Sequence, residues 1–316
     1  MSLAEYVRIL GRGPGRSRSL TRGEAQESMR LILSGHAAPE AIGALLMLLR
    51  MKGETAAEIA GFADSAAAVS PALPAIDLDW PSYAAGRTRG QPWFLLSAKL
   101  VAQAGHRVLL HGWNGGDPKV RAGLADAGIG FAKSVDETAH LLDRDGIAYL
   151  PLEYLHPRLF RLLNLRDVLG LRSCINTVCR MLNPARAGAS VQGVFHPSYR
   201  LLQAEAAELR GWSSLSVIKG AGGEFERNPA KELAVFGLRD GRVWDATLPA
   251  LRRETLRLAE ASDRSLPDLW AGASTTGFEA TLVTATAALA LDTLGHRDSD
   301  VLANDLWTHR RSRPAA

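Results

Sequence analysis

The chain has 316 residues, 47% of them hydrophobic and 22% charged, and its 37 Lys and Arg against 33 Asp and Glu give a formal net charge of +4. This composition excludes a largely disordered chain, and the length suffices for a large domain with a small one, or for two domains. The only two cysteines, Cys174 and Cys179, exclude a disulfide framework, so we expect buried reduced thiols. We find no signal peptide, no apolar run long enough for a membrane span and no histidine pattern of zinc catalysis, and therefore expect a cytoplasmic protein without a membrane partner.

The first 70 residues read as helices only. Thr21 and Glu24 form a capping box, in which each side chain accepts a hydrogen bond from a free backbone N–H at a helix start. Pro39 opens the next helix, which we expect Gly53 to end. Thr55 and Glu58 form a second capping box, and prolines from residue 71 to residue 74 break the helical pattern.

Strands and helices alternate after residue 74. Short apolar strands are predicted at residues 107–111, 147–150, 189–195 and 215–219, with helical sequence between them. This alternation predicts an α/β fold with a central, mainly parallel sheet covered by helices, preceded by a small all-helical domain. Residues 154–186 interrupt the alternation with helical, basic sequence, and the chain from about residue 272 is helical again.

The positive charge is concentrated in three segments, although the total is small. Residues 6–23 contain five arginines and no acid, while residues 82–125 and residues 154–186 each contain six basic residues and one aspartate. Arginine binds phosphate through two parallel hydrogen bonds, so these segments are typical of a surface that binds the phosphates of a small ligand or of a polynucleotide. A solvated basic face is the alternative interpretation.

Motifs along most of the chain carry a resemblance to a known superfamily. They are Leu33–Gly35, Ile42–Thr55, Glu58–Gly61, His111–Gly112, His156–Pro157, Gly170–Asn176, Leu182–Pro184, Gln192–Val194 and His196–Pro197. Together they resemble the anthranilate phosphoribosyltransferase and nucleoside phosphorylase superfamily, glycosyltransferase family 3. The resemblance implies a helical dimerisation domain of residues 1–70 with 154–186, an α/β domain of residues 74–150 with 187–316, a phosphoribosyl site at the strand ends, and a homodimer.

The segment that binds pyrophosphate in that superfamily is altered here. The family's glycine loop falls on Ser82–Gly86, and its Asn-Ile-Ser-Thr falls on Pro92–Leu95, where Pro92 has no N–H to donate. In their place stand Arg87, Arg89, Trp93 and Phe94, a mixture of cations and aromatic rings that suits a sugar-phosphate backbone with a stacked base. The alternative is that the two rings are the core face of a helix.

A degenerate ligand pocket is expected at the strand ends. Its candidate residues are Gly86, His111, Gly112, Asn114, Arg166 and Lys219, of which Arg166 corresponds to the family's substrate arginine. We expect His111 to be a strand-end hydrogen-bonding residue and assign no catalytic residue. Glu224 and Glu226 lie where the family has the carboxylates that bind magnesium, and they are weak metal candidates. A structural salt bridge to Arg227 explains the pair at least as well.

Two functions follow. The first, which we expect, is a non-sequence-specific DNA- and RNA-binding protein that needs no cofactor and resembles the YbiB-type branch of the superfamily. Its phosphate-binding candidates are Arg12, Arg16, Arg18, Arg87, Arg89, Lys119, Arg121, Arg158, Arg161 and Arg166. The alternative is a magnesium-dependent phosphoribosyltransferase or nucleoside phosphorylase with an altered donor loop. A groove for a protein partner is a third interpretation that no motif favours.

Overall fold

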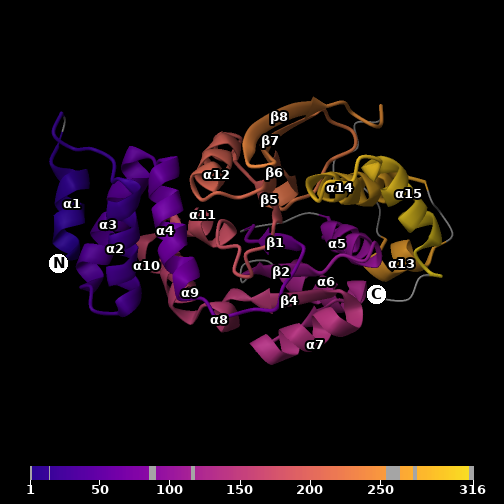
Figure 1. Cartoon of the computed structure of the whole chain (residues 1–316), viewed down its shortest axis with the longest axis horizontal. Coiled ribbons are helices and arrows are strands. Elements are labelled where there is room, and N and C mark those ends of the chain that lie inside the picture. Colours follow the sequence, from indigo (N-terminus) through magenta and orange to yellow (C-terminus); the bar gives the residue numbers. More distant parts are fainter. Residues whose placement is uncertain are drawn as a thin grey trace.

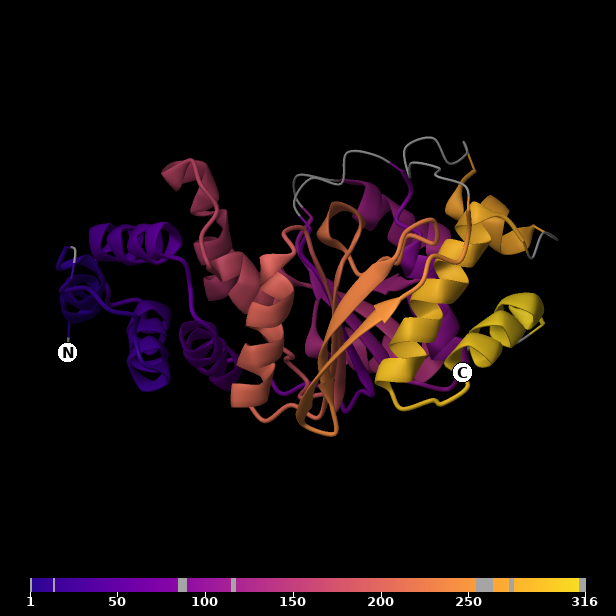
Figure 2. The same ribbon diagram turned by 90° about the horizontal axis from the view of Figure 1, so that it is seen from above.

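The structure is a computed structural model that describes residues 2–13, 15–84, 90–114, 118–253, 264–272 and 276–312. A bundle of helices lies at one end of the molecule, and a twisted sheet with helices on both faces forms the rest (Figures 1 and 2). The predicted fold class, a small helical domain with a large α/β domain, is confirmed. None of the described helices is long and apolar enough to cross a membrane.

Three of the four N-terminal helices begin where the sequence predicts, and the helix that Pro39 opens also ends there. The four helices are α1 (Leu3–Gly11), α2 (Arg22–Ser34), α3 (Pro39–Lys52) and α4 (Ala56–Ala68). Both predicted capping boxes form, at Thr21 and at Thr55, and Gly53 ends α3 with a positive φ that a side chain would disfavour. Three short helices from the middle of the chain lie beside this bundle: α9 (Pro157–Asn164), α10 (Arg166–Leu169) and α11 (Ile175–Arg180). A single turn, α8 (Leu152–Leu155), precedes them and packs on α9 and the sheet.

The sheet has eight strands in the order β3-β4-β2-β1-β5-β6-β7-β8. The parallel strands are β1 (Leu78–Ser82), β2 (Val108–Gly112), β3 (Gly130–Phe131), β4 (Ile147–Pro151), β5 (Ala189–Val194) and β6 (Ser214–Lys219). An antiparallel hairpin of β7 (Leu233–Arg239) and β8 (Arg242–Leu248) completes it. This hairpin was not among the predicted elements, although Asp240–Gly241 between two apolar runs is a turn signal that predicts one.

The remaining helices cover the two faces of the sheet. They are α5 (Phe94–Gln103), α6 (Pro118–Ala127), α7 (Val135–Asp145), α12 (Ser198–Leu209), α13 (Leu266–Ala271), α14 (Phe278–Thr293) and α15 (Ser299–His309), with a short 3-10 turn at Ala221–Gly223. Side chains alternate across β2, so that Leu109 packs on one face and Leu110 on the other. The core on the Leu109 face continues into the N-terminal bundle and contains both cysteines, whose pKa values burial raises.

The strand order places a crevice between β1 and β5. The chain leaves β1 through α5 toward β2 on one side, and it leaves β5 through α12 toward β6 on the other. Because the two connections diverge, the carboxyl ends of β1 and β5 stay uncovered, and ligands of parallel α/β sheets bind at such a point. The fold therefore indicates where to look for a site.

Candidate functional site

A cavity of about 500 Å³ lies at the carboxyl ends of β1 and β5, between the sheet and the helical bundle. Residues from α3, α11, α12 and the intervening loops complete its wall. The lining residues are Arg50, Ala84, Gly170, Leu171, Arg172, Ser173, Asn176, Thr177, Arg180, Val194, Phe195, His196, Tyr199, Gln203 and Gly222. The cavity has the size and the position of a small-molecule site.

Three arginines face this cavity. Arg50 comes from α3, Arg172 from the loop before α11, and Arg180 from α11 itself. No Asp or Glu belongs to the described part of the wall. Burial lowers the pKa of Arg172, and the positive charges of Arg166 and Arg50 lower it further. A wall with three arginines and no described acidic residue favours an anionic ligand.

Arg180 is the most deeply placed of the three. It is 6% exposed, and its Nε donates a hydrogen bond to the carbonyl oxygen of Gly193 in β5 at 3.0 Å. Its Nη1 donates to the side-chain oxygen of Asn176, whose Nδ2 in turn donates to the carbonyl of Tyr83 at 3.2 Å. Burial lowers the pKa of Arg180, and the charge of Glu224 opposes that effect. The guanidinium group is therefore held in one orientation against the strand ends.

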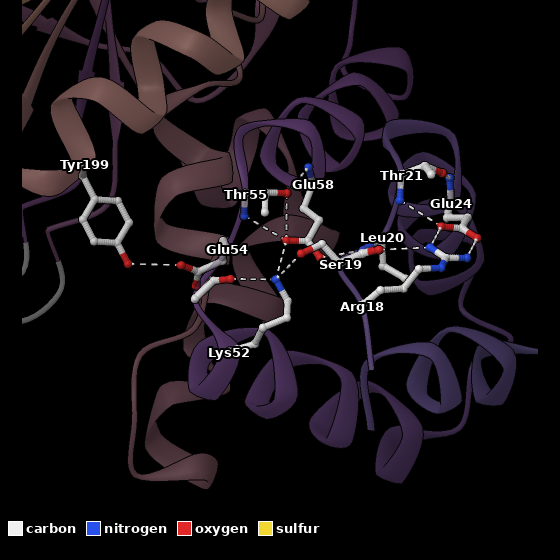
Figure 3. Close-up of polar contacts among 11 residues, drawn as sticks. Arg18, Ser19, Leu20, Thr21, Glu24, Lys52, Glu54, Thr55, Glu58 and Tyr199 are labelled. Carbon is white, nitrogen blue, oxygen red and sulfur yellow. Dashed lines mark hydrogen bonds and ion pairs between the residues drawn. The ribbon is translucent and has the colours of Figure 1, made fainter. Parts of the chain in front are cut away.

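The helical bundle is fixed to the cavity through the loop after α3. The Nζ of Lys52 forms an ion pair with the buried carboxylate of Glu58 at 2.9 Å. The same carboxylate accepts a hydrogen bond from the backbone N–H of Leu20 at 2.8 Å (Figure 3). On the other side of the loop, the hydroxyl of Tyr199 in α12 donates to Glu54 at 3.3 Å (Figure 3). Tyr199 thus joins the bundle to the α/β part at the edge of the cavity.

The predicted pocket residues that the structure describes are not among those that line this cavity. His111 is fully buried, with Nδ1 2.8 Å from the Tyr83 hydroxyl and Nε2 3.0 Å from Asp79. Asn114 is buried and accepts a hydrogen bond from the Tyr149 hydroxyl at 3.0 Å. These hydrogen bonds hold both side chains in the buried core at the strands, where they have a structural role.

The other predicted pocket positions are dispersed. Gly112 is packed so tightly that a Cβ there would lie 2.0 Å from the carbonyl oxygen of Ser82. Lys219 ends β6 with an exposed side chain. Arg166 lies beside the cavity, 5.9 Å from the ring centroid of Trp113. Gly86 lies outside the described residues.

Glu224 and Glu226, the weak metal candidates, do not form a metal site. Both are buried in the loop that follows β6. Glu224 accepts hydrogen bonds from the Ser82 hydroxyl at 2.9 Å and the Ala84 N–H at 3.1 Å, and Glu226 accepts the Phe94 N–H at 3.1 Å. No cluster of three or more potential metal ligands occurs in the part of the chain that the structure describes. The carboxylates hold backbone groups, so these residues do not fit the magnesium ion that the family implies.

Trp93 and Phe94 are core residues. Both are fully buried, and the Phe94 ring stacks on Trp80 with centroids 6.3 Å apart. The interpretation of these two rings as a stacking surface for nucleic-acid bases is therefore wrong, because no base can reach them. Arg87 and Arg89, the cations that were expected beside them, lie outside the described residues.

Four of the eight remaining basic candidates have partners within the chain that the structure shows. The pairs are Arg18 with Glu24, Arg121 with Glu153, Arg166 with Asp167, and Arg158 with the carbonyl of Leu33. Arg12, Arg16, Lys119 and Arg161 are exposed. They come from the α1–α2 connection, α6 and α9, which lie apart in Figure 1. A charge count along the sequence could not include Glu153, which is 32 residues from Arg121, or the Leu33 carbonyl, which is 125 residues from Arg158.

Several cavity residues were not among the predicted sites. Arg50, Arg172, Arg180, Phe195, His196 and Tyr199 line the cavity. Phe195 and His196 directly follow a predicted strand, and this position at a strand end was the available signal. Nothing in the sequence placed Arg50 in the same cavity as Arg180, because this depends on how the bundle packs on the sheet.

The comparisons with known proteins point to one family. Residues 4–69 match the family described as glycosyl transferase family, helical bundle domain. Anthranilate phosphoribosyltransferase from Hahella chejuensis is 30% identical over 73% of this chain and 68% of its own length. The enzyme from Roseiflexus is 32% identical over 78% of this chain and 76% of its own length.

Solved structures share the fold. Anthranilate phosphoribosyltransferase from Thermus thermophilus superimposes with a TM-score of 0.79 at 23% identity, over 98% of this chain and 95% of that one. The Saccharomyces cerevisiae enzyme in complex with PRPP and Mg gives a TM-score of 0.77 at 15% identity, over 99% and 94%.

The expected nucleic-acid function is wrong. Relatives that match most of the chain are phosphoribosyltransferases, and the cations assigned to a nucleic-acid groove are largely paired or dispersed. The comparisons support the superfamily but do not confirm the YbiB-type branch. The homodimer stays a prediction.

Proposed function

We propose that this chain, which belongs to the anthranilate phosphoribosyltransferase family, transfers a phosphoribosyl group to the amine of an aromatic acid bound in the arginine cavity. The observation that carries the proposal is the wall of this cavity, with Arg50, Arg172 and Arg180 facing it at the carboxyl ends of β1 and β5. A carboxylate there would accept charge-assisted hydrogen bonds from these guanidinium groups.

The reaction we propose is a substitution at C1 of the ribose. The amine nitrogen of the acceptor forms a bond to C1, the bond from C1 to the pyrophosphate oxygen breaks, and pyrophosphate leaves with that electron pair. The amine then releases one proton to water. The contribution of the chain is to bind and orient the acceptor, which raises the rate by placing the nitrogen near the carbon that it attacks.

We assign no magnesium ligand among the described residues of this chain. Glu224 and Glu226, which stand where the family has its magnesium-binding carboxylates, accept hydrogen bonds from the backbone N–H groups of Ala84 and Phe94. We therefore assign the recognition of negative charge to the arginines.

A product balance tests the proposal. The purified chain is incubated with phosphoribosyl pyrophosphate and anthranilate, while anthranilate consumption and pyrophosphate release are measured together. We expect equal amounts of both, and neither change when one substrate is omitted. A folded chain that releases no pyrophosphate in the presence of anthranilate would show the proposal to be wrong.

A further inference from the structure

We infer that Asp79, a buried carboxylate of β1, is a positioning residue that holds Arg180 in the orientation in which it meets a ligand of the cavity. Asp79 is not among the described residues that line the cavity. The inference rests on the proposed function only in taking the aromatic acid as that ligand. Its evidence is two hydrogen-bonded paths, which start at the two oxygens of this carboxylate and end at Arg180.

Asp79 is a charged side chain in the core of the sheet. It is fully buried, and its register partners are Leu109 of β2 and Ser190 of β5, so that the three side chains lie on one face. Removing a carboxylate from water destabilises a fold unless hydrogen bonds replace its hydration, and an apolar side chain would pack here without that cost. The groups that the two oxygens hold therefore indicate why a carboxylate stands at this position.

The first path runs through His111 and Tyr83. Oδ1 of Asp79 lies 3.0 Å from Nε2 of His111, and Nε2 carries a proton because a carboxylate oxygen only accepts. In the neutral ring Nδ1 then accepts from the hydroxyl of Tyr83 at 2.8 Å. The backbone carbonyl of Tyr83 accepts from Nδ2 of Asn176 at 3.2 Å, and the side-chain oxygen of Asn176 accepts from Nη1 of Arg180. The anchored ring of Tyr83 thus fixes the carbonyl that holds Asn176 and, through it, the guanidinium group.

The second path runs along β5. Oδ2 of Asp79 accepts from the hydroxyl of Ser190 at 2.7 Å. The oxygen of that hydroxyl accepts from Nε2 of Gln192 at 3.3 Å, and the same Nε2 donates to the backbone carbonyl of Arg180 at 3.0 Å. Ser190 and Gln192 are both fully buried. This path therefore fixes the main chain of Arg180 on the strand to which its Nε also donates, at Gly193.

The two paths hold different parts of Arg180. The first acts on the guanidinium group and the second on the main chain, whereas Nη2 has no hydrogen-bond partner within the described part of the chain. The charge of Glu224 also acts on this group, but the two paths act on its orientation. A guanidinium group recognises a carboxylate through the directions of its N–H groups, so a turned Arg180 would bind the acid less tightly.

Three variants test the paths. Asp79→Asn keeps the size of the side chain but replaces one acceptor by a donor, so that one of its two contacts is lost. Ser190→Ala removes the second path alone and serves if Asp79→Asn does not fold. Ser216→Ala is the matched control, because Ser216 is also fully buried in a parallel strand, β6, and contacts the hydroxyl of Thr293 at 2.7 Å, outside both paths.

Hydrogen exchange of the arginine Nε–H groups, followed by NMR on the isotope-labelled chain, reports the position of Arg180 without any ligand. Arg180→Lys assigns its signal. We expect slow exchange in the native chain, because this N–H donates within a buried contact. Exchange should be at least about threefold faster in Asp79→Asn and Ser190→Ala and unchanged in Ser216→Ala. Unchanged exchange in both path variants, or equal acceleration in the control, would overturn the inference.

Anthranilate binding, measured by calorimetry without a donor, tests the consequence for the cavity. We expect Asp79→Asn to weaken binding about fivefold, the typical effect of one hydrogen bond, and Ser216→Ala to leave it within about twofold. Added to Arg180→Gln, Asp79→Asn should cause no further loss, since it acts through Arg180. Equal losses with and without Arg180→Gln, or unchanged affinity in Asp79→Asn, would refute the positioning role.

These outcomes separate the inference from the proposed function. A native chain that binds no anthranilate removes the proposed function, while exchange of the Arg180 Nε–H still decides whether Asp79 holds this side chain. A native chain that transfers the phosphoribosyl group, with the same Arg180 exchange in Asp79→Asn and Ser190→Ala, removes the inference alone.

Discussion

The carboxylate of Glu226 accepts a hydrogen bond from the backbone N–H of Phe94 at 3.1 Å, and so a side chain from the loop after β6 occupies the start of α5. The first N–H groups of a helix attract anions, since they have no partner within the helix. Glu224 accepts a hydrogen bond from the N–H of Ala84, which lies two residues beyond the end of β1. The chain's own carboxylates thus hold backbone donors that an anionic ligand would otherwise reach.

Removing this contact should lower stability. We expect Glu226→Leu to reduce the free energy of unfolding by about 1–3 kcal/mol, because the Phe94 N–H is then buried without this acceptor. Glu226→Gln keeps an acceptor and should lose less. Urea denaturation provides the measurement, with Glu208→Leu on the exposed face of α12 as control. A loss no larger than that of the control would contradict the assigned role.

The close approach of β5 to the loop after β6 should not tolerate a side chain at Gly193. A Cβ there would lie 2.0 Å from the carbonyl carbon of Glu224, and the strand leaves it no room to move. We expect Gly193→Ala to cost about 3 kcal/mol through overpacking. Gly23→Ala in α2, where nothing lies within 4 Å of the new Cβ, should be neutral or slightly stabilising. Thermal and urea unfolding compare the two, and equal effects would contradict this packing.

The ion pair of Arg18 with Glu24 predicts a pH dependence of stability. Hydrogen bonds from Arg18 are the largest cause that lowers the pKa of Glu24 from 4.5 to about 2. Because the folded pKa lies below the unfolded one, the contribution is complete above pH 4.5 and is lost as the pH falls toward 2. Urea midpoints of Arg18→Gln should therefore fall less steeply than those of the native chain over this range. The exposed Arg16→Gln should follow the native curve, and identical curves for all three chains would refute the assignment.

The chain alone should not bind magnesium. Glu224 and Glu226 are buried and engaged with Ser82, Ala84 and Phe94, so we expect no saturable heat when Mg²⁺ is titrated into the protein. Glu224→Gln should behave identically in this titration. Saturable binding of one Mg²⁺ that Glu224→Gln abolishes would restore the metal site.

The sequence predicted the architecture better than the site. Capping boxes at Thr21 and Thr55 are local signals, and the helices that they predicted are present. The sequence offered both a buried and an exposed interpretation of Trp93 and Phe94. The two rings are buried because the first turn of α5 packs on Trp80, a contact between elements that the sequence does not reveal. Hydrophobic periodicity predicts which elements form, but not which of their residues meet.

The partners of the charged residues could not be predicted from the sequence either. Arg121 lies in a basic segment of the sequence and yet pairs with Glu153, which is 32 residues away and follows β4. Arg50 was not singled out at all, and it reaches the cavity only because the bundle packs against α11 and α12. Both relationships arise from tertiary packing, which a local charge count does not include.

The most direct test of the account compares phosphoribosyl transfer to anthranilate by the native chain, Arg172→Gln and Arg161→Gln. If the arginine cavity holds the acceptor, Arg172→Gln should lower kcat/KM at least about tenfold, the loss of one charge-assisted contact. Arg161→Gln, outside the cavity, should stay within about twofold of the native chain. Full activity in Arg172→Gln, or equal losses in both variants, would contradict the claim that this cavity is the site of transfer.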